Sequence, residues 1–410
     1  MDRIVVTGVG CVSPLGTLEE LWSGLVEGRS GVGFITAFAS EPYKTRIAGQ
    51  VTGFDPLAFM PQREVNATAR CVQFGVAAAR MAATHGGLDF SRIDPRRIGV
   101  YMGTSIGPLA LAVEQHTVCL EKGISRVHPM APAQNHTGVL ASEISILLGI
   151  KGPSMTIASA CTSGADALGI AMSQIRSGVI DVAIAGASEA PLFPTLFAAF
   201  DRLALMSRRP GDPCAACRPF SLARDGIVLS EGAGVCVLES EQHARSRKAL
   251  MLAELAGFGA TSDAYHHFQQ RPEGEEAARA IEVALMDAKA VPDDVDYVSA
   301  HGTGTLSNDA IETIVIKRAL GSRASTVPVS SIKSMTGHLM GACAALEAVA
   351  CVKTLQDQIV PPTINLHERD PACDLDYVPN EARRVRMRTI VSNSFGFGSR
   401  NAALVFRSIF

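Results

Sequence analysis

Short runs of apolar, β-favouring residues alternate along this chain with longer segments whose apolar positions recur at helical spacing. In the first half the pattern predicts strands at residues 3–10, 98–102 and 181–186, and helices near 18–27 and 65–84. Repeated alternation of strand and helix is typical of α/β proteins, in which helices pack on the faces of a sheet. We therefore predict an α/β fold.

One transition in this pattern points to chemistry. The β-favouring run 154–157 ends in small residues around Cys161, and apolar positions then recur at 165, 168, 171, 172 and 175. This predicts a strand, a sharp turn and a helix that begins beside Cys161. Unpaired N–H groups and the dipole at a helix N-terminus favour a thiolate. Because the small neighbours leave room for a substrate, we interpret Cys161 as a nucleophile rather than as an inert buried cysteine.

After about residue 255 the same order of predicted elements returns, although identity between the halves is slight. Segment 295–303 corresponds to 98–104, strand 327–332 with helix 339–355 corresponds to the Cys161 unit, and a hairpin at 390–406 corresponds to one at 226–239. The duplicated order predicts two similar halves, residues 1–255 and 256–410, packed together. A site formed where the halves meet would draw residues from both.

Two histidines of the second half follow probable strands. His301 lies in Ala300-His-Gly-Thr-Gly-Thr305, and His338 ends the segment 331–338. A single histidine in such a place is more often structural than catalytic. Because both lie on strand-to-helix turns laid out like the Cys161 turn, and glycine-rich backbone lets a ligand approach, we favour a functional role for both.

A third glycine-rich turn closes the chain at residues 393–401. Its backbone N–H groups could form an oxyanion hole, and Phe395 and Phe397 could line an apolar tunnel. The alternative is a tight hairpin without a functional role.

Composition narrows the class of protein. With 410 residues, 47% hydrophobic and 19% charged, the chain can fill two or three globular cores. A net charge of −3 with scattered basic residues gives no stripe for nucleic acid. Ten cysteines without the spacing of a disulfide framework suit a reducing compartment, and neither a secretory signal nor an apolar run long enough to span a membrane is found, so we expect a cytoplasmic protein.

No metal centre or cofactor is predicted. The only CxxC motif joins Cys214 and Cys217, and it lacks a second pair of Cys or His ligands nearby. Its proline-rich surroundings favour a surface loop.

Four motifs together resemble those of the β-ketoacyl-acyl carrier protein synthases, nearest to the elongating, synthase II-like branch. They are Ala160-Cys-Thr-Ser-Gly164, Ala300-His-Gly-Thr-Gly-Thr305, Ser331-Ile-Lys-Ser-Met-Thr-Gly-His338 and Pro361-Pro-Thr-Ile-Asn365. The resemblance covers essentially the whole chain. It implies a thiolase fold, with five αβαβα layers from two duplicated halves, and an obligate dimer.

The resemblance also implies a reaction. Cys161 would take an acyl chain from acyl carrier protein, and a malonyl-type extender would lose CO2 and attack that thioester. A thiolate is both a good nucleophile and a good leaving group. Neutral His301 and His338 would donate N–H groups to the enolate, and the backbone N–H groups of Cys161 and Phe397 would stabilise the oxyanion of the acyl thioester.

Further residues receive roles by the same resemblance. Lys333 belongs to the catalytic group, and Glu347, Thr303 and Thr305 support it. Phe397, with Phe395, forms a gate. Ile106 and Phe200 lie in the acyl pocket, which borders the dimer partner.

Competing chemistries lack residues that they require. A thiolase would need a second active-site cysteine in the last glycine-rich loop, and residues 390–410 contain none. Initiating synthases usually carry Cys-His-Asn, papain-like proteases have their own signature around the cysteine, and chain-length factors, which bind a ketosynthase without catalysing, lose the cysteine. Here His338 fills the third place, the protease signature is absent, and Cys161 argues against a chain-length factor.

Departures from the elongating pattern leave the pathway open. Ser399 and Arg400 stand where Gly-x is common, Ala69 replaces a common Asp, and the segment 306–313 looks more like polyketide ketosynthases. Two hypotheses therefore remain: a homodimeric fatty-acid enzyme, or the ketosynthase subunit of a type II polyketide or polyene synthase with a chain-length-factor partner. For docking of an acidic carrier protein, the candidate basic residues are Arg63, Arg126, Arg202, Arg208 and Arg209.

Overall fold

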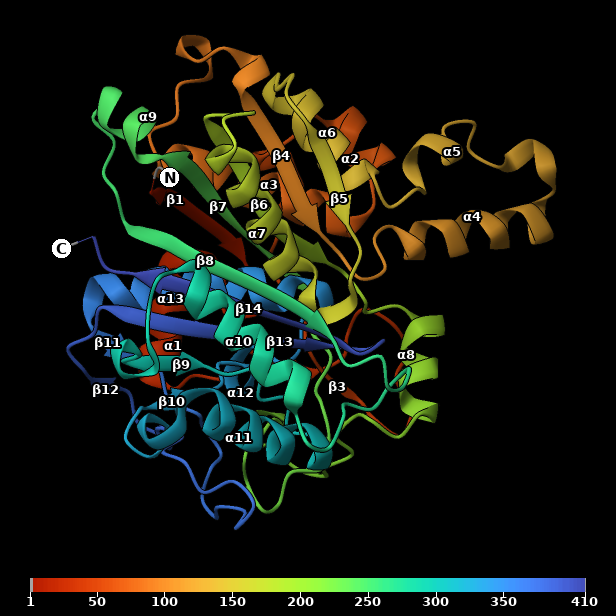
Figure 1. Cartoon of the computed structure of the whole chain (residues 1–410). Helices are drawn as coiled ribbons and strands as arrows, with labels where there is room; N and C mark the ends of the chain where they lie inside the picture. The colour runs from red at the N-terminus through yellow and green to blue at the C-terminus, as the bar shows by residue number, and fades with distance from the viewer. Residues whose placement is uncertain (1–2, 410) are drawn as a thin grey trace.

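The computed structural model describes residues 3–409, and its central feature is a pair of five-stranded arrays (Figure 1). The strands of the first are β1 (Ile4–Val12), β4 (Ile98–Gly103), β5 (Ser154–Ile157), β6 (Val182–Glu189) and β7 (Gly232–Ser240). Those of the second are β8 (Ala253–Ser262), β9 (Tyr297–Ser299), β10 (Val329–Ser330), β13 (Thr389–Gly396) and β14 (Arg400–Arg407).

Both arrays have the same strand order. The first runs β5-β4-β6-β7-β1 and the second β10-β9-β13-β14-β8, so that each half repeats one topology. β4 is parallel to β5 and β6, as β9 is to β10 and β13, whereas β7 and β14 run antiparallel to their neighbours. A short antiparallel pairing of Val5 with Glu254 and Val6 with Ala253 joins β1 to β8. The duplicated α/β architecture expected from the sequence is confirmed.

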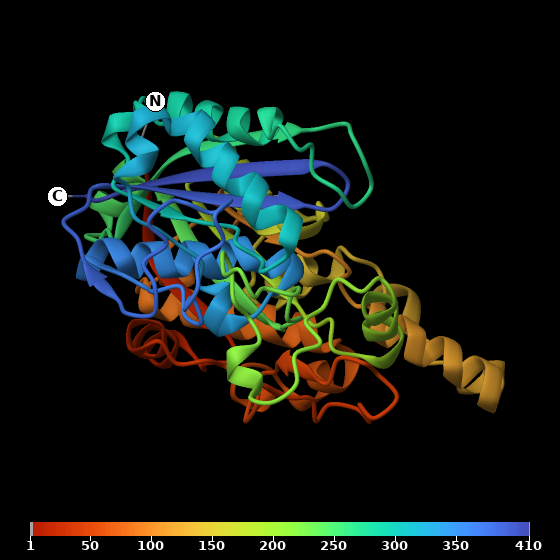
Figure 2. The same ribbon diagram turned by 90° about the horizontal axis from the view of Figure 1, so that it is seen from below.

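Helices cover both outer faces and fill the space between the arrays (Figures 1 and 2). On the first array pack α3 (Arg70–His85) and α6 (Val139–Leu148); on the second packs α10 (Glu275–Asp287), with α11 (Leu306–Leu320) beside it. Between the arrays lie α7 (Ser163–Arg176) and α13 (Cys343–Asp357), and each contacts strands of both. These are the five αβαβα layers of the thiolase fold.

The two central helices bury most of their residues between the arrays, and small and apolar side chains predominate among those buried residues. They also approach each other closely. A Cβ atom at Gly164 would lie 2.8 Å from the backbone nitrogen of Ala345, so only glycine fits there. The one acidic side chain of α13 inside this layer, Glu347, pairs with Lys333.

The other helices and the short strands surround this frame. They are α1 (Leu18–Glu27), α2 (Gln62–Ala67), α4 (Leu109–Lys122), α5 (Ala131–Gln134), α8 (Pro194–Arg202), α9 (Glu241–Ser246), α12 (Lys333–Thr336), β2 (Val32–Phe34) with β3 (Ile47–Gly49), and β11 (Ile359–Val360) with β12 (Arg383–Arg384). The segment with α4 and α5 projects from the body as an arm (Figures 1 and 2).

Some of the helices and hairpins predicted from the sequence are present in the structure, and others are not. The hairpin at 390–406 is present as β13 and β14, and α1 begins and ends as expected. The helix expected at 65–84 is two helices, because Thr68 and Ala69 are extended and the Thr68 hydroxyl donates to the Glu64 carbonyl. The hairpin expected at 226–239 is wrong: only β7 is a strand, and Leu229 instead forms a bridge with His338.

Two further expectations concern loops and boundaries. Cys214 is exposed, as a surface loop requires, but Cys217 is buried, so the surface-loop interpretation holds for one cysteine only. The proposed boundary at 255/256 falls inside β8, and this division remains a prediction. Within residues 3–409, every helix is too short or too polar to cross a membrane.

Candidate active site

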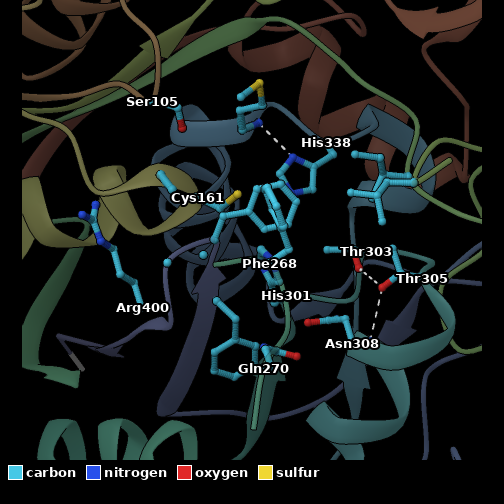
Figure 3. Close-up of a pocket in the computed structure, with 18 of the residues that line it drawn as sticks. Ser105, Cys161, Phe268, Gln270, His301, Thr303, Thr305, Asn308, His338 and Arg400 are labelled. Carbon is cyan, nitrogen blue, oxygen red and sulfur yellow. Dashed lines mark hydrogen bonds between the residues drawn. The ribbon is translucent and has the colours of Figure 1, made fainter. Parts of the chain in front are cut away.

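A cavity of about 670 Å³ lies where the two halves meet, and Figure 3 shows part of its lining. Among the residues singled out in the sequence, those that line it are Cys161, His301, His338, Phe395, Phe397, Ile106, Phe200, Thr303 and Thr305. Lys333 does not line the cavity; it lies behind His301, with Glu347 beyond it. The fold thus gathers nearly the whole predicted set around one space.

Cys161 sits in the turn between β5 and α7, and a single turn of 3₁₀-helix, Ala160–Thr162, leads into α7. Ala160 has a left-handed backbone (φ 56°), a strained conformation of the kind that clusters at functional sites. Burial raises the pKa of the Cys161 thiol to about 12, although Lys333 and the Phe397 N–H act to lower it. Desolvation therefore outweighs the combined effect of these two groups.

His338 sits in a turn of the same design. Met340 also has a left-handed backbone (φ 49°), and a 3₁₀ turn, Met340–Ala342, leads into α13. The Met340 N–H donates to His338 Nδ1 over 2.9 Å, so the neutral ring carries its proton on Nε2. Burial and then Lys333 lower the pKa of His338 to about 3. The ring is a neutral N–H donor at physiological pH.

His301 follows β9 and meets His338 edge to face, with ring centroids 5.7 Å apart and planes at 82°. The Lys333 ammonium lies 3.4 Å from His301 Nδ1, which makes that nitrogen the acceptor and leaves the proton on Nε2. Burial, followed by the charge of Lys333, holds the pKa of His301 well below its usual value. The Glu347 carboxylate pairs with Lys333, and its negative charge keeps the pKa of the Lys333 ammonium raised although that ammonium is buried.

Two acidic residues of α11 support the backbone of His301, and they were not predicted from the sequence. Glu312 accepts the N–H groups of His301 and Gly302, each over 2.7 Å, and Asp309 accepts those of Thr303 and Gly304 over 3.1 and 3.2 Å. Asp309 and Glu312 are one turn apart on α11. A helix predicted over 306–320 would therefore have placed both on the same face, beside the segment 300–305. Burial raises the pKa of Glu312 to about 7.

The contacts around the turn between β13 and β14 were not predicted from the sequence either. The ring of Phe397 packs against Phe200 and, edge to face at 5.3 Å, against Phe268. Ser399 Oγ accepts the N–H groups of Tyr265 and His266, both over 3.1 Å. The Arg400 guanidinium donates to the Ala158 carbonyl over 3.0 Å. Ser399 and Arg400, which depart from the elongating pattern, therefore connect this turn to Tyr265 and His266 on one side and to Ala158 on the other.

Metal ligands are a separate question. Across residues 3–409, no group of three or more His, Cys, Asp or Glu side chains is arranged to hold a metal ion.

Comparison with known proteins identifies the family. The Beta-ketoacyl synthase N-terminal domain matches residues 1–244 and the C-terminal domain matches residues 252–367. The chain is 41% identical to 3-oxoacyl-[acyl-carrier-protein] synthase 2 of Synechocystis sp., over 99% of this chain and 98% of that protein. It is 42% identical to putative polyketide beta-ketoacyl synthase 1 of Streptomyces cyaneus, over 98% and 97%.

Among solved structures, the ishigamide ketosynthase/chain length factor superposes with a TM-score of 0.93 at 35% identity, with each chain fully covered. Similarity of sequence and of fold thus extends over the whole length of the chain. The site described above lies on both matched domains, Cys161 on the first and both histidines on the second. This chain belongs to the beta-ketoacyl synthase family of carbon–carbon bond-forming acyltransferases.

Proposed function

We propose that Cys161 holds the growing acyl chain while His301 and His338 promote decarboxylation of a malonyl thioester on acyl carrier protein. The observation that carries this proposal is the convergence of one thiol and two imidazoles, both kept neutral with the proton on Nε2, on a single cavity. Each group then has a form that suits one step of the condensation.

In the first step, the Cys161 sulfur attacks the carbonyl carbon of an acyl thioester on the carrier. The acyl–sulfur bond of the carrier breaks, and the proton of Cys161 leaves with the carrier thiolate, so no net proton is released. The attacking form is the thiolate, which Lys333 and the Phe397 N–H favour, and the proton that Cys161 gives up ends on the carrier thiol. The N–H groups of Cys161 and Phe397 stabilise the tetrahedral oxyanion.

In the second step, the malonyl thioester loses CO2, and the electron pair of the broken bond passes to the thioester oxygen as an enolate. The Nε2–H groups of His301 and His338 meet this oxygen from two directions. The enolate carbon then attacks the Cys161 thioester, which forms the new carbon–carbon bond and frees the Cys161 sulfur. The product is a β-ketoacyl group on the carrier.

The surface supports a proposal about partners. β5 is an edge strand whose Met155 is 48% exposed, and the arm exposes Leu120 and Ile124 at 73% and 85%. Such an apolar edge and arm are typical of surfaces that a second subunit covers. We propose that this subunit is a copy of the chain or a chain-length-factor-like protein. All ten cysteines are free, and on this ground we place the enzyme in the cytoplasm.

The test is intact-protein mass spectrometry after incubation with a panel of acyl carrier proteins, some loaded with fatty acyl chains and others with polyketide-type chains. We expect the mass of the enzyme to rise by one acyl group, and the group taken identifies the pathway. An unchanged mass with every carrier would refute acyl transfer to this chain.

Salt should weaken the carrier interaction. Carrier proteins are acidic, and the five arginines Arg63, Arg126, Arg202, Arg208 and Arg209 are all exposed. Because salt screens attraction between exposed charges, rising ionic strength is expected to raise the apparent KM for carrier-bound substrates several-fold and to spare small thioester mimics. Steady-state kinetics with both substrate types measures this. Equal salt dependence for carrier and mimic would count against the arginines.

Pocket length should set chain length. Ile106, Phe200, Met340 and Phe397 belong to one apolar cluster beside the cavity. Each added methylene of a chain gains only about 0.8 kcal/mol on burial, whereas overlap with a packed side chain costs about 1–3 kcal/mol. Ile106→Phe is therefore expected to shorten the longest acyl group loaded, with the shortest group loaded at the normal rate as internal control. A chain-length profile equal to that of the unaltered enzyme would show that the pocket lies elsewhere.

A further inference from the structure

The hydroxyl group of Ser105 lines the cavity without a hydrogen-bond partner. Its Oγ atom is shielded from solvent, and no donor or acceptor among residues 3–409 pairs with it. Figure 3 shows this oxygen turned toward the interior, on the side where Cys161 lies. Buried hydroxyl groups in proteins are nearly always paired, so this one calls for an explanation.

The turn that carries Ser105 is held rigidly. The buried carboxylate of Glu189 accepts the Thr104 hydroxyl over 2.8 Å, the Ser105 N–H over 2.5 Å and the Gly341 N–H over 3.1 Å. Glu189 lies at the end of β6 and is fully buried, so these bonds fix the turn against both halves of the site. Ser105 therefore presents its hydroxyl from a preorganised position.

The surroundings of this hydroxyl are apolar. Ile106 follows it directly in the chain, and Phe200 and Met340 line the same cavity. The hydroxyls of Thr303 and Thr305 on the other wall already have partners: Thr303 Oγ1 lies 3.1 Å from Thr305 Oγ1, and the latter accepts the Asn308 N–H. One other lining atom, the amide nitrogen of Gln270, also lacks a partner within 3–409, and Figure 3 places it across Cys161 from Ser105.

An unpaired hydroxyl discriminates between chains. A saturated hydrocarbon chain beside Ser105 leaves the hydroxyl buried and unpaired, as it is without a chain, and gains nothing from it. A chain that carries a carbonyl or hydroxyl oxygen at that depth satisfies it. We infer that Ser105 is a specificity-determining residue, and that Cys161 takes an oxygen-bearing acyl chain, such as a β-oxo or β-hydroxy acyl group, in preference to a saturated chain of equal length. This inference rests on the proposed acyl transfer to Cys161.

The experiment is a competition. The enzyme is offered an equimolar pair of acyl carrier proteins, one with a saturated chain and one with a β-hydroxyacyl chain of the same length, and loading of Cys161 is followed by mass spectrometry. A second pair carries the oxygen two carbons further along. Because a neutral hydrogen bond changes selectivity modestly, Ser105→Ala is expected to lower the preference for the oxygenated chain by about three- to tenfold in at least one pair.

Matched variants keep the test sharp. Ser322→Ala deletes an exposed hydroxyl that does not line the cavity, and the loading ratio should stay at its original value. Ser105→Cys keeps the shape of the side chain but supplies only a weak donor, so it should also lower the preference for the oxygenated chain. It replaces Ser105→Ala in the test if the alanine variant does not fold. An unaltered enzyme without preference, or a ratio unmoved by both Ser105 variants, overturns the inference. If none of the chains loads onto Cys161, the proposed acyl transfer is refuted instead.

Discussion

Replacement of Cys161 by alanine is expected to abolish acyl loading, with a loss of about 10⁴-fold or more. The alanine variant has no sulfur to form the thioester, and the neighbouring groups of the cavity cannot substitute for it. The fold should persist, because the side chain becomes smaller by one atom in a turn whose backbone bonds remain. Intact-protein mass spectrometry with acyl carrier protein measures loading, and circular dichroism with light scattering checks fold and oligomeric state.

The control for this variant is another cysteine. Cys214 is exposed and lies outside the cavity, so it is the thiol on which unspecific acylation would be found. Cys214→Ala should load as the unaltered enzyme does. Loading of the Cys161 variant at the normal level would show that the nucleophile is a different residue.

The second large effect concerns the histidines. His301→Ala and His338→Ala are each expected to reduce malonyl decarboxylation by about 10²–10³-fold, the loss found when one oxyanion donor is removed. Acyl loading of Cys161 should fall far less, because the backbone N–H groups of Cys161 and Phe397 serve that step. Release of labelled CO2 measures decarboxylation, and mass spectrometry of the acyl enzyme measures acyl loading.

The exposed His367 provides the matched control, since it lies outside the cavity and His367→Ala should leave both half-reactions unchanged. The pH profile gives an independent readout. Because the pKa of His338 is lowered to about 3, its neutral form predominates above that pH, and decarboxylation should show no histidine titration between about pH 5 and 8. Equal losses in both half-reactions, or an inflection near pH 6.5 that Glu312→Gln does not remove, would contradict the assigned roles.

The sequence by itself determined the parts of the protein that depend on near neighbours. Small residues and helical spacing after Cys161 predicted the strand, turn and helix found there, and glycines at 396 and 398 predicted the hairpin of β13 and β14. Local conformation follows from residue type and spacing within a few positions, which is why these elements could be read directly. The identity of the site residues came from motifs, each of which is also local.

Only the tertiary structure decided the properties that depend on distant neighbours. The proton on Nε2 of His338 follows from Met340, but the neutrality of the ring follows from burial and from Lys333. The raised pKa of Cys161 follows from burial as well. Loop 263–271 contacts the turn that carries Phe397, although the two are far apart in the sequence. Ser105 is held beside the cavity by Glu189, which accepts its N–H from another strand. Desolvation and hydrogen-bond satisfaction are sums over every atom nearby, and most of those atoms belong to residues far away in the chain.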